Sequence, residues 1–151
     1  MTLLTLKSRK KTIFYQFIIL ACPSGWTQID GQCLKLWHEA KTWNDAEKTC
    51  IANGGHLATI GTQAQNDWIS ANAKYTTWHG ATDQFSEGKW TEALGQNALQ
   101  FSDWYQHGTP EPNGGTNENC GAMFIGSSAG CTWCGKWVDV ECHHSAYHFV
   151  C

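Results

Sequence analysis

Eight cysteines in a chain of 151 residues constrain the fold more than any other feature of the sequence. This cysteine density in a short chain is typical of a disulfide framework that forms in an oxidising compartment. The length suits one domain with its own core, and nine tryptophans supply large side chains to fill it. The net charge of -3 lacks the basic excess of a nucleic-acid-binding protein, so we expect no nucleic-acid partner.

The first residues predict a secretory signal peptide that covers residues 1–21. A basic stretch, from Lys7 to Lys11, precedes an apolar run over residues 12–21 that ends at the small residue Ala21. The run is about half of the roughly twenty residues that a transmembrane helix needs, which disfavours the alternative of an uncleaved membrane anchor. We therefore expect a secreted, extracellular protein without membrane insertion, whose mature part is residues 22–151.

Two helices are predicted in the first half of the mature chain. Residues with apolar side chains recur at steps of three and four from Ala40 to Cys50, as one face of a helix requires, and Gly54-Gly55 would end that helix. Thr62 and Gln65 form a capping box, so a second helix should begin near Thr62.

The second half of the chain favours strands and long loops. Short apolar runs are separated there by Gly- and Asn-rich stretches, and helices ahead of strands favour an α+β domain. The stretch from Thr82 to Glu118 has little regular pattern, but its aromatic residues predict an ordered, packed loop. The strands that we expect are residues 56–60, 76–80, 88–91, 121–125, 136–140 and 147–151.

Three oxygen-bearing side chains, those of Glu111, Asn113 and Glu118, lie close together in the sequence around Pro112. Calcium takes about six to eight oxygen ligands, which carboxylates and carboxamides provide. A cis X-Pro bond would direct both flanking side chains into one space, and a bridge from Cys120 to Cys142 would bring Asp139 back to this loop. The alternative is a polar turn, which Pro, Asn and Gly also favour.

Short motifs follow one another along the chain: Cys22-Pro-Ser-Gly-Trp26, Trp43-Asn-Asp-Ala46-Glu47, Gly54-Gly55-His56-Leu57-Ala58, Trp78-His79-Gly80, Phe101-Ser-Asp-Trp104, Glu118-Asn119-Cys120, Trp137-Val138-Asp139 and Phe149-Val150-Cys151. Together with Glu111-Pro112-Asn113, they make residues 22–151 resemble the C-type lectin-like domains. The resemblance implies a disulfide-stapled α+β double-loop fold. Two helices flank small antiparallel sheets there, and a long loop carries a calcium and sugar site.

The same resemblance implies three disulfides, which are Cys22–Cys33, Cys50–Cys151 and Cys120–Cys142. Cys131 and Cys134 remain, in a stretch that is longer than the usual turn of the family. Three interpretations of this pair stay open: a local bridge, a bridge to another subunit, or a redox site. Glycines flank the pair and a predicted strand follows it, so no helix dipole would acidify a thiol, which disfavours the redox site.

Site residues follow from the resemblance, position by position. Glu111 and Asn113 would bind one calcium ion and also hydrogen-bond one sugar hydroxyl, and Glu118 would do the same for the adjacent hydroxyl. Asp139 would supply a side-chain and a backbone oxygen. The Glu-Pro-Asn order resembles lectins for mannose-type sugars with vicinal equatorial hydroxyls, whereas galactose binders usually carry Gln-Pro-Asp. An amide donates and accepts but a carboxylate only accepts, so their order selects the hydroxyl geometry.

Val138 departs from the family pattern, which has Asn at this position. Valine has no side-chain oxygen, so one calcium ligand and one hydrogen-bond donor for the sugar are missing. A lost hydrogen bond beside a polar partner costs about 1–3 kcal/mol. A second, auxiliary calcium site would use Asp83, Glu87 and Asn119, but Gly114 stands where the family often has an acid; the alternative is a solvated acidic loop.

These features predict a calcium-dependent lectin for mannose-type glycans, in which Ca2+ is part of the ligand site. The alternative is a lectin-like protein that binds a protein or another non-sugar surface, because Val138 weakens the site. We predict no enzymatic activity, since no catalytic triad motif is present. A single sugar site is weak, so we expect avidity through homo-oligomers. His143, His144 and His148 would allow zinc, but neighbouring residues of a strand face opposite ways, which favours separate histidines.

Overall fold

The computed structural model describes residues 21–126 and 130–151, so the predicted signal peptide lies outside the described residues except for Ala21. No helix in these described ranges has the length and apolarity that crossing a bilayer requires. In chain order the elements are β1 (Thr27–Ile29), β2 (Gln32–Leu34), β3 (Leu36–Lys41), α1 (Trp43–Ala52), α2 (Gln63–Asn72), β4 (Thr77–Thr82), the 3-10 turn η1 (Gly115–Asn117), β5 (Cys120–Met123), β6 (Trp137–Val140) and β7 (Tyr147–Val150).

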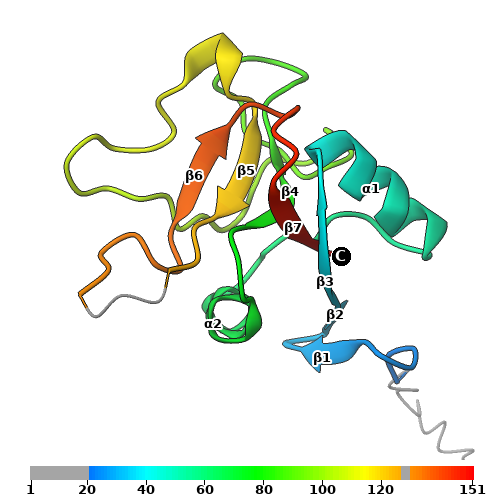
Figure 1. Ribbon diagram of the computed structural model, residues 1–151. Coiled ribbons are helices and arrows are strands. Elements are labelled where there is room, and N and C mark those ends of the chain that lie inside the picture. Colours follow the sequence, from blue (N-terminus) through cyan, green and yellow to red (C-terminus); the bar gives the residue numbers. More distant parts are fainter. Residues whose placement is uncertain (1–20, 127–129) are drawn as a thin grey trace, which may run out of the picture.

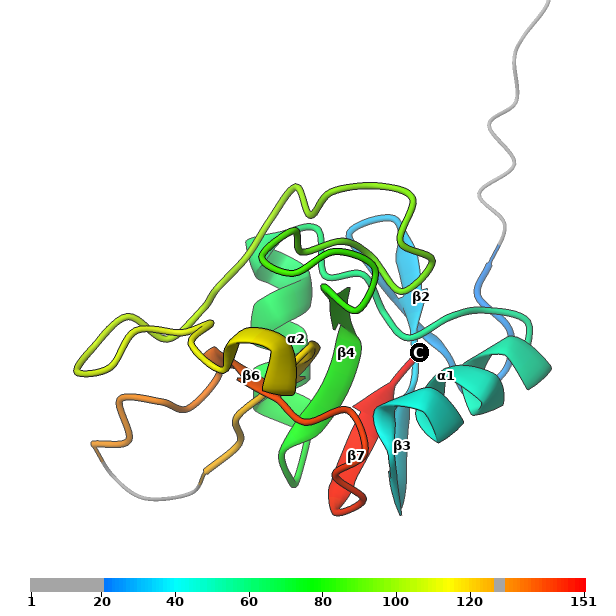
Figure 2. The same ribbon diagram turned by 90° about the horizontal axis from the view of Figure 1, so that it is seen from above.

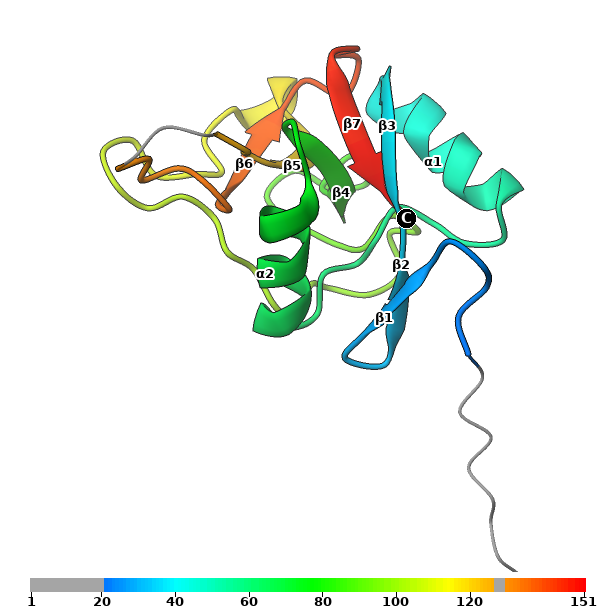
Figure 3. The ribbon, with the colours of Figure 1, turned by 60° about the horizontal axis from the view of Figure 1, so that its bottom comes forward.

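Two sheets organise the chain. β1 and β2 form an antiparallel hairpin, and five strands form the main sheet in the order β3-β7-β4-β5-β6. Its neighbours are antiparallel except β4 and β7, which are parallel. Helix α1 lies beside β3, and α2 lies on the other side of β7 and β4 (Figures 1 and 3). The α+β fold with two helices flanking the sheet is confirmed.

Both helices begin at a threonine whose side chain satisfies a free backbone N–H of the first turn. Thr42 accepts from the N–H of Asp45 at 3.2 Å, and Thr62 accepts from the N–H of Gln65 at 3.3 Å. The predicted start of the second helix is therefore confirmed. The predicted start of the first helix is wrong, because Ala40 belongs to β3, whose backbone is extended up to the cap.

Two of the predicted strands are wrong. Residues 56–60 form no strand, because this segment bonds the backbones of β7 and β4 through Ala58 alone. The N–H of Ala58 donates to the Val150 carbonyl at 2.9 Å, and its carbonyl accepts from Gly80 at 2.8 Å. Residues 88–91 pair with β4 only through Thr91, because the preceding residues fold into a turn.

Aromatic and aliphatic side chains fill two adjoining core clusters. One gathers around Trp78 and Phe149 and the other around Trp137, and all three side chains are fully buried. The clusters lie on opposite faces of the main sheet, because neighbouring strand residues alternate between the faces. The sheet is thus covered on both faces. A shift of one residue between β5 and β6 would move their side chains to the wrong faces, so this burial fixes the register of the two strands.

Four disulfides close this framework, and they join Cys22 to Cys33, Cys50 to Cys151, Cys120 to Cys142, and Cys131 to Cys134. The first three are the pairs that the family resemblance implies, and the fourth is the local bridge among the three interpretations. All eight cysteines lie in the described residues and none has a free thiol.

The long segment between β4 and β5 packs onto the second core cluster, as its aromatic residues predict. The N–H of Tyr105 donates to the Trp137 carbonyl at 2.9 Å, and the N–H of Trp137 donates to the Asp103 carbonyl at 2.9 Å. The Trp104 ring meets the Trp137 ring edge to face, with the centroids 5.5 Å apart. Seen from above, the segment reaches past β6 before it returns through η1 (Figure 2). β6 therefore sets the position of the segment.

Candidate functional site

Asp139 connects the main sheet to the Glu-Pro-Asn loop. On β6 it pairs with Gly121 of β5, and its side chain is buried. Both carboxylate oxygens accept from the N–H of Asn113 at 3.0 Å, and Oδ2 also accepts from the N–H of Gly114 at 2.7 Å. A carboxylate that receives backbone N–H groups forms charge-assisted hydrogen bonds, which are stronger than neutral ones. Asp139 thus holds the loop against the strand.

The Glu-Pro-Asn loop is closed by its own hydrogen bonds. The N–H of Glu111 donates to the Tyr105 carbonyl at 2.8 Å, and the Gln106 side chain donates to the Glu111 carbonyl at 2.7 Å. The Asn113 amide donates to the Pro110 carbonyl at 3.2 Å, and the Glu111–Pro112 peptide bond is cis. These bonds occupy backbone groups and leave the Glu111 carboxylate to the neighbouring side chains.

Glu118 reaches the same place from the other side of the loop. It follows η1, and its N–H donates to the Gly115 carbonyl at 3.2 Å. A Cβ atom built on Gly114 would overlap the Glu118 side chain. Glycine at position 114 therefore leaves room for this carboxylate, where an acidic side chain of the usual family pattern would collide with it.

The carboxylates of this loop destabilise one another when they are ionised. Burial raises the pKa of Glu111 to about 8, and the Asp139 carboxylate adds to the rise, whereas the Asn113 side chain opposes it. Burial also raises the pKa of Glu118, and repulsion from Asp139 and Glu141 contributes. Like charges that are held close together favour protonation or a bound cation. The all-oxygen donor set suits a hard cation such as calcium.

The predicted ligands are brought together only in part by the structure. Asp139, Asn113 and Glu111 adjoin through the contacts above, and Glu118 interacts with Asp139 through charge. Within the described residues, no group of three or more His, Cys, Asp or Glu side chains is assembled closely enough to hold a metal ion. A cation at this loop would therefore draw the carboxylates inward.

Asp83 lies at the start of the predicted auxiliary site. Its Oδ2 accepts from the N–H of Gly88 at 2.9 Å, and its Oδ1 is buried without a hydrogen-bond partner among the described residues. Burial raises the pKa of Asp83, and the Asp139 charge adds to the rise. The N–H of Asp83 donates to the Asn119 carbonyl at 3.2 Å, whereas Glu87 is exposed in the adjacent turn. Asp83 and Asn119 are thus adjacent.

The three histidines of the zinc alternative have separate neighbours. His143 pairs with Glu141 at 3.0 Å, and the His144 ring packs on Tyr147. The His148 ring lies instead against Tyr75, with the centroids 4.5 Å apart. These contacts favour histidines that act separately in packing and surface pairing.

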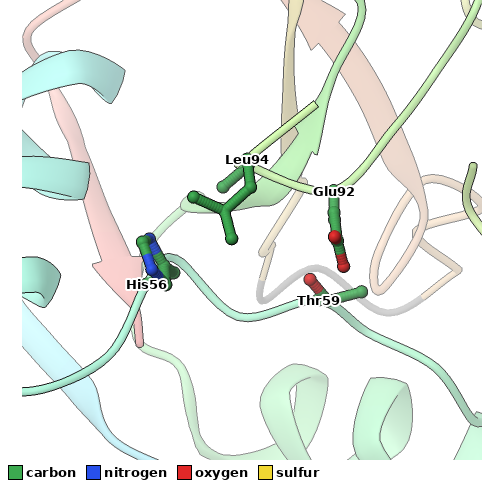
Figure 4. A pocket seen from close by; sticks show the side chains of 5 residues that line it. His56, Thr59, Glu92 and Leu94 are labelled. Atoms are coloured by element: carbon green, nitrogen blue, oxygen red, sulfur yellow. The ribbon is translucent and has the colours of Figure 1, made fainter. Parts of the chain in front are cut away.

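A small hollow lies apart from the Glu-Pro-Asn loop and Glu118, which together form the carboxylate loop. Its volume is about 70 Å³, and Figure 4 shows His56 and Thr59 facing Glu92 and Leu94 across it. Glu47 of α1 holds the His56 side, since its carboxylate accepts from the Leu57 N–H at 2.7 Å and contacts the His56 ring. Glu47 has a structural role here, because both of its oxygens are already bonded.

The backbone groups that position the site have no signature in the sequence. The Tyr105 carbonyl and the Gly114 N–H hold the loop, and every residue type except proline carries such groups. The one signal in the sequence was the aromatic content of residues 101–105, which indicated that the loop would be packed and ordered.

The chain belongs to the Lectin C-type domain family, whose profile matches residues 39–151. Among curated relatives, human tetranectin is 30% identical over 91% of this chain and 71% of its own length. The chain spans 62% of the length of the mouse and bovine tetranectins that it also matches. The family groups binding domains that are generally without enzymatic activity.

Solved structures share the fold. The cow C-type carbohydrate-recognition domain of CD23, in the presence of GlcNAc2Man3 oligosaccharide, has a TM-score of 0.72 and 30% identity over 87% of this chain and 94% of that one. A calcium-independent type II antifreeze protein has a TM-score of 0.72 and 24% identity, over 87% of this chain and 92% of that one. The second likeness concerns the fold alone.

Stability should depend on pH through Glu111. Its pKa rises from 4.5 to about 8 on folding, so the folded protein binds this proton more tightly than the unfolded chain does. The stabilisation is complete below pH 4.5 and is lost as pH rises toward about 8. In metal-free protein, the free energy of unfolding of the wild type relative to Glu111→Gln should therefore fall across this interval. Urea titrations at several pH values would measure it, and a difference that rises with pH would contradict the assignment.

Proposed function

We propose that the chain is a secreted calcium-dependent lectin that prefers mannose-type sugars, with residues 22–151 as its carbohydrate-recognition domain. The observation that carries this proposal is the anchoring of the Glu-Pro-Asn loop by the Asp139 carboxylate. It places a buried acid from the sheet next to Glu111 and Asn113, where a cation would relieve the repulsion between the carboxylates.

Four side chains would hold the calcium ion: Glu111, Asn113, Glu118 and Asp139. When bound, the ion supplies positive charge that attracts two vicinal hydroxyl oxygens of the sugar. The carboxylates of Glu111 and Glu118 accept hydrogen bonds from these hydroxyls, and the Asn113 amide is able to donate one. This arrangement of acceptors and a donor orients the hydroxyl pair, and the Glu-Pro-Asn order favours the equatorial pair of mannose. The cow CD23 domain, which was crystallised in the presence of a mannose-containing oligosaccharide, supports this choice.

The experiment that tests the proposal is retention on immobilised mannose. We expect the oxidised protein to bind in millimolar calcium, to elute with a chelator, and to be displaced by free mannose but not by galactose. Glu118→Gln removes a proposed ligand charge and should abolish retention, whereas Glu92→Gln, at the separate hollow, should leave it unchanged. Retention that survives the chelator, or equal displacement by both sugars, would contradict the proposal. Light scattering on the same samples would measure the oligomeric state on which avidity depends.

A second candidate function is a lectin-like protein that binds a protein or another non-sugar surface. The observation that favours it is the position of Val138, which pairs with Ala122 and packs against the first core cluster. An apolar side chain in that place gives no oxygen to a metal. The two functions differ in whether binding requires calcium, which the chelator step decides.

Val138→Asn should strengthen calcium binding and mannose binding together. The substitution restores one oxygen and one N–H donor next to Asp139, which corresponds to about 1–3 kcal/mol in total. Titration calorimetry with calcium, and then with mannose in saturating calcium, would measure both affinities. Val138→Leu is the matched control, because leucine has nearly the shape of asparagine but carries no oxygen and no donor. Unchanged affinities in Val138→Asn would contradict the prediction, because they would mean that position 138 supplies no ligand to the site.

A further inference from the structure

Trp133 is an exposed aromatic side chain that is held on a buried one. It lies in the short segment between Cys131 and Cys134 and keeps 38% of its surface exposed. Its indole ring stacks on the Tyr105 ring, with the centroids 3.7 Å apart and the planes 11° from parallel. Tyr105 itself is 5% exposed. The tyrosine thus supports one side of the indole ring, while the indole still meets solvent.

The backbone of this segment is fixed as well. The Cys131–Cys134 bridge closes around Trp133, and the Trp133 carbonyl accepts from the N–H of Lys136 at 2.9 Å. The Gly135 N–H donates to the Phe124 carbonyl at 2.9 Å, which ties the segment to the end of β5. An aromatic side chain that is ordered in advance loses little conformational entropy when it binds a ligand. This is a property of a binding platform.

The platform and the carboxylate loop share one support. The Tyr105 ring carries Trp133, and the Tyr105 carbonyl accepts from the N–H of Glu111 at 2.8 Å. Figures 1 and 3 show the segment that follows residue 130 running beside the long loop, on the side of the molecule away from α1. A ligand bound at Glu111 would therefore have Trp133 near one of its ends.

We infer that Trp133 forms a second sugar subsite, which takes the pyranose residue next to the one held at the Glu-Pro-Asn loop. One face of a pyranose ring carries C–H groups, whose partial positive charge is attracted to the negative face of an aromatic ring. An indole ring that stacks on Tyr105 on one side and keeps 38% of its surface exposed suits this face. The inference rests on the proposed function, and it adds a preference for oligosaccharides over single sugars.

The test compares two sugars on each variant of the oxidised full-length mature chain. Calorimetry in saturating calcium would measure the affinities for methyl α-mannoside and for a mannotriose. We expect the wild type to bind the mannotriose about tenfold more tightly, which corresponds to about 1.4 kcal/mol. Trp133→Ala should remove this preference and leave the mannoside affinity unchanged, whereas Trp133→Tyr should keep most of it. Phe85→Ala is the control, because Phe85 is also exposed but packs against Gly95.

The possible outcomes distinguish a failure of the proposed subsite from a failure of the proposed lectin function. If the wild type binds mannoside but the mannotriose no more tightly, or if Trp133→Ala keeps the preference, the subsite is wrong and the lectin function stands. An equal loss for both sugars in Trp133→Ala would show that Trp133 only supports the loop, which overturns the subsite. If the wild type binds neither sugar in calcium, the proposed function and the subsite both fail. The ratio of affinities is independent of the fraction of folded protein, so modest destabilisation does not imitate the expected result.

Discussion

Calcium should raise the melting temperature of the wild-type protein, and Asp139→Asn should abolish this effect. A ligand that binds only the folded state at a hundred times its Kd stabilises that state by about 2.7 kcal/mol. For a domain of this size, about 1 kcal/mol moves the melting temperature by about 2–4 °C, so we expect a rise of about 5–10 °C. Asp139 is central because it would supply charge to the ion and already holds the loop through the N–H groups of Asn113 and Gly114.

Thermal melts with calcium, with a chelator and with both in sequence would measure this effect. Glu39→Gln is the matched control, because Glu39 is an exposed carboxylate on β3 that pairs with Lys41, and its removal should leave the calcium shift intact. Glu118→Gln combined with Asp139→Asn should show no shift at all. A wild-type protein that does not respond to millimolar calcium, or an Asp139→Asn variant that keeps the whole shift, would remove the metal site from the proposal.

Local signals in the sequence predicted the elements whose ends are set by neighbouring residues. The start of α2 is one example, since Thr62 and Gln65 carry the capping signal within four positions. The reciprocal bond of a capping box is replaced, because the Gln65 side chain accepts from the N–H of Gly61 at 2.8 Å. The start of α1 was placed too early, because Ala40 fits the helical spacing although its segment pairs with β7.

The wrongly predicted strands have the opposite cause, because strand pairing depends on residues that are distant in the sequence. Residues 56–60 contain Leu57, Ala58 and Ile60, which are buried as a strand would require. The neighbouring strands β4 and β7 already pair with each other at Thr77 and Trp78, so the segment bonds β4 only at Gly80 and β7 only at Val150. Residues in β1, β2 and β3 gave no strand prediction. β1 and β2 have only three residues each, and the helical spacing of Ala40 assigned the end of β3 to the first helix.

The composition of the candidate site could be read from the sequence, but its geometry could not. Glu111, Asn113, Glu118 and Asp139 were predicted because their side chains carry the oxygens that calcium uses and because they match the family pattern. The hydrogen bonds that place them involve backbone groups of Tyr105, Gly114 and Gly115. Such groups are nearly the same in every residue type, so the sequence does not indicate which of them form these bonds. The steric reason for Gly114 also required the structure, since it depends on where the Glu118 side chain lies.

The disulfides should contribute unequally to stability, and the largest loss is expected for Cys50–Cys151. This bridge joins residues that are 101 positions apart, whereas Cys131 and Cys134 are 3 positions apart. In the chain-entropy account, a bridge across about 100 residues stabilises the folded state by about 4.7 kcal/mol, and a bridge across three or four residues by about 2 kcal/mol. Replacing Cys50 and Cys151 by alanine should therefore lower the free energy of unfolding by more than twice as much as replacing Cys131 and Cys134.

Urea unfolding of the metal-free variants would measure both losses, with alanine in each pair so that the side chains match. Cys50 and Cys151 are buried, so their variant also loses core packing, which adds to the difference. Peptide mapping of the unreduced wild type should find Cys131 joined to Cys134 within one chain. A link to a second chain would replace the local bridge by a covalent dimer, and equal losses in the two variants would contradict the chain-entropy account. The Cys50–Cys151 ring encloses the main sheet except β3, and with it the whole carboxylate loop. Removal of this bridge should therefore weaken calcium binding as well as the fold. Removal of the Cys131–Cys134 bridge should change sugar binding only through Trp133.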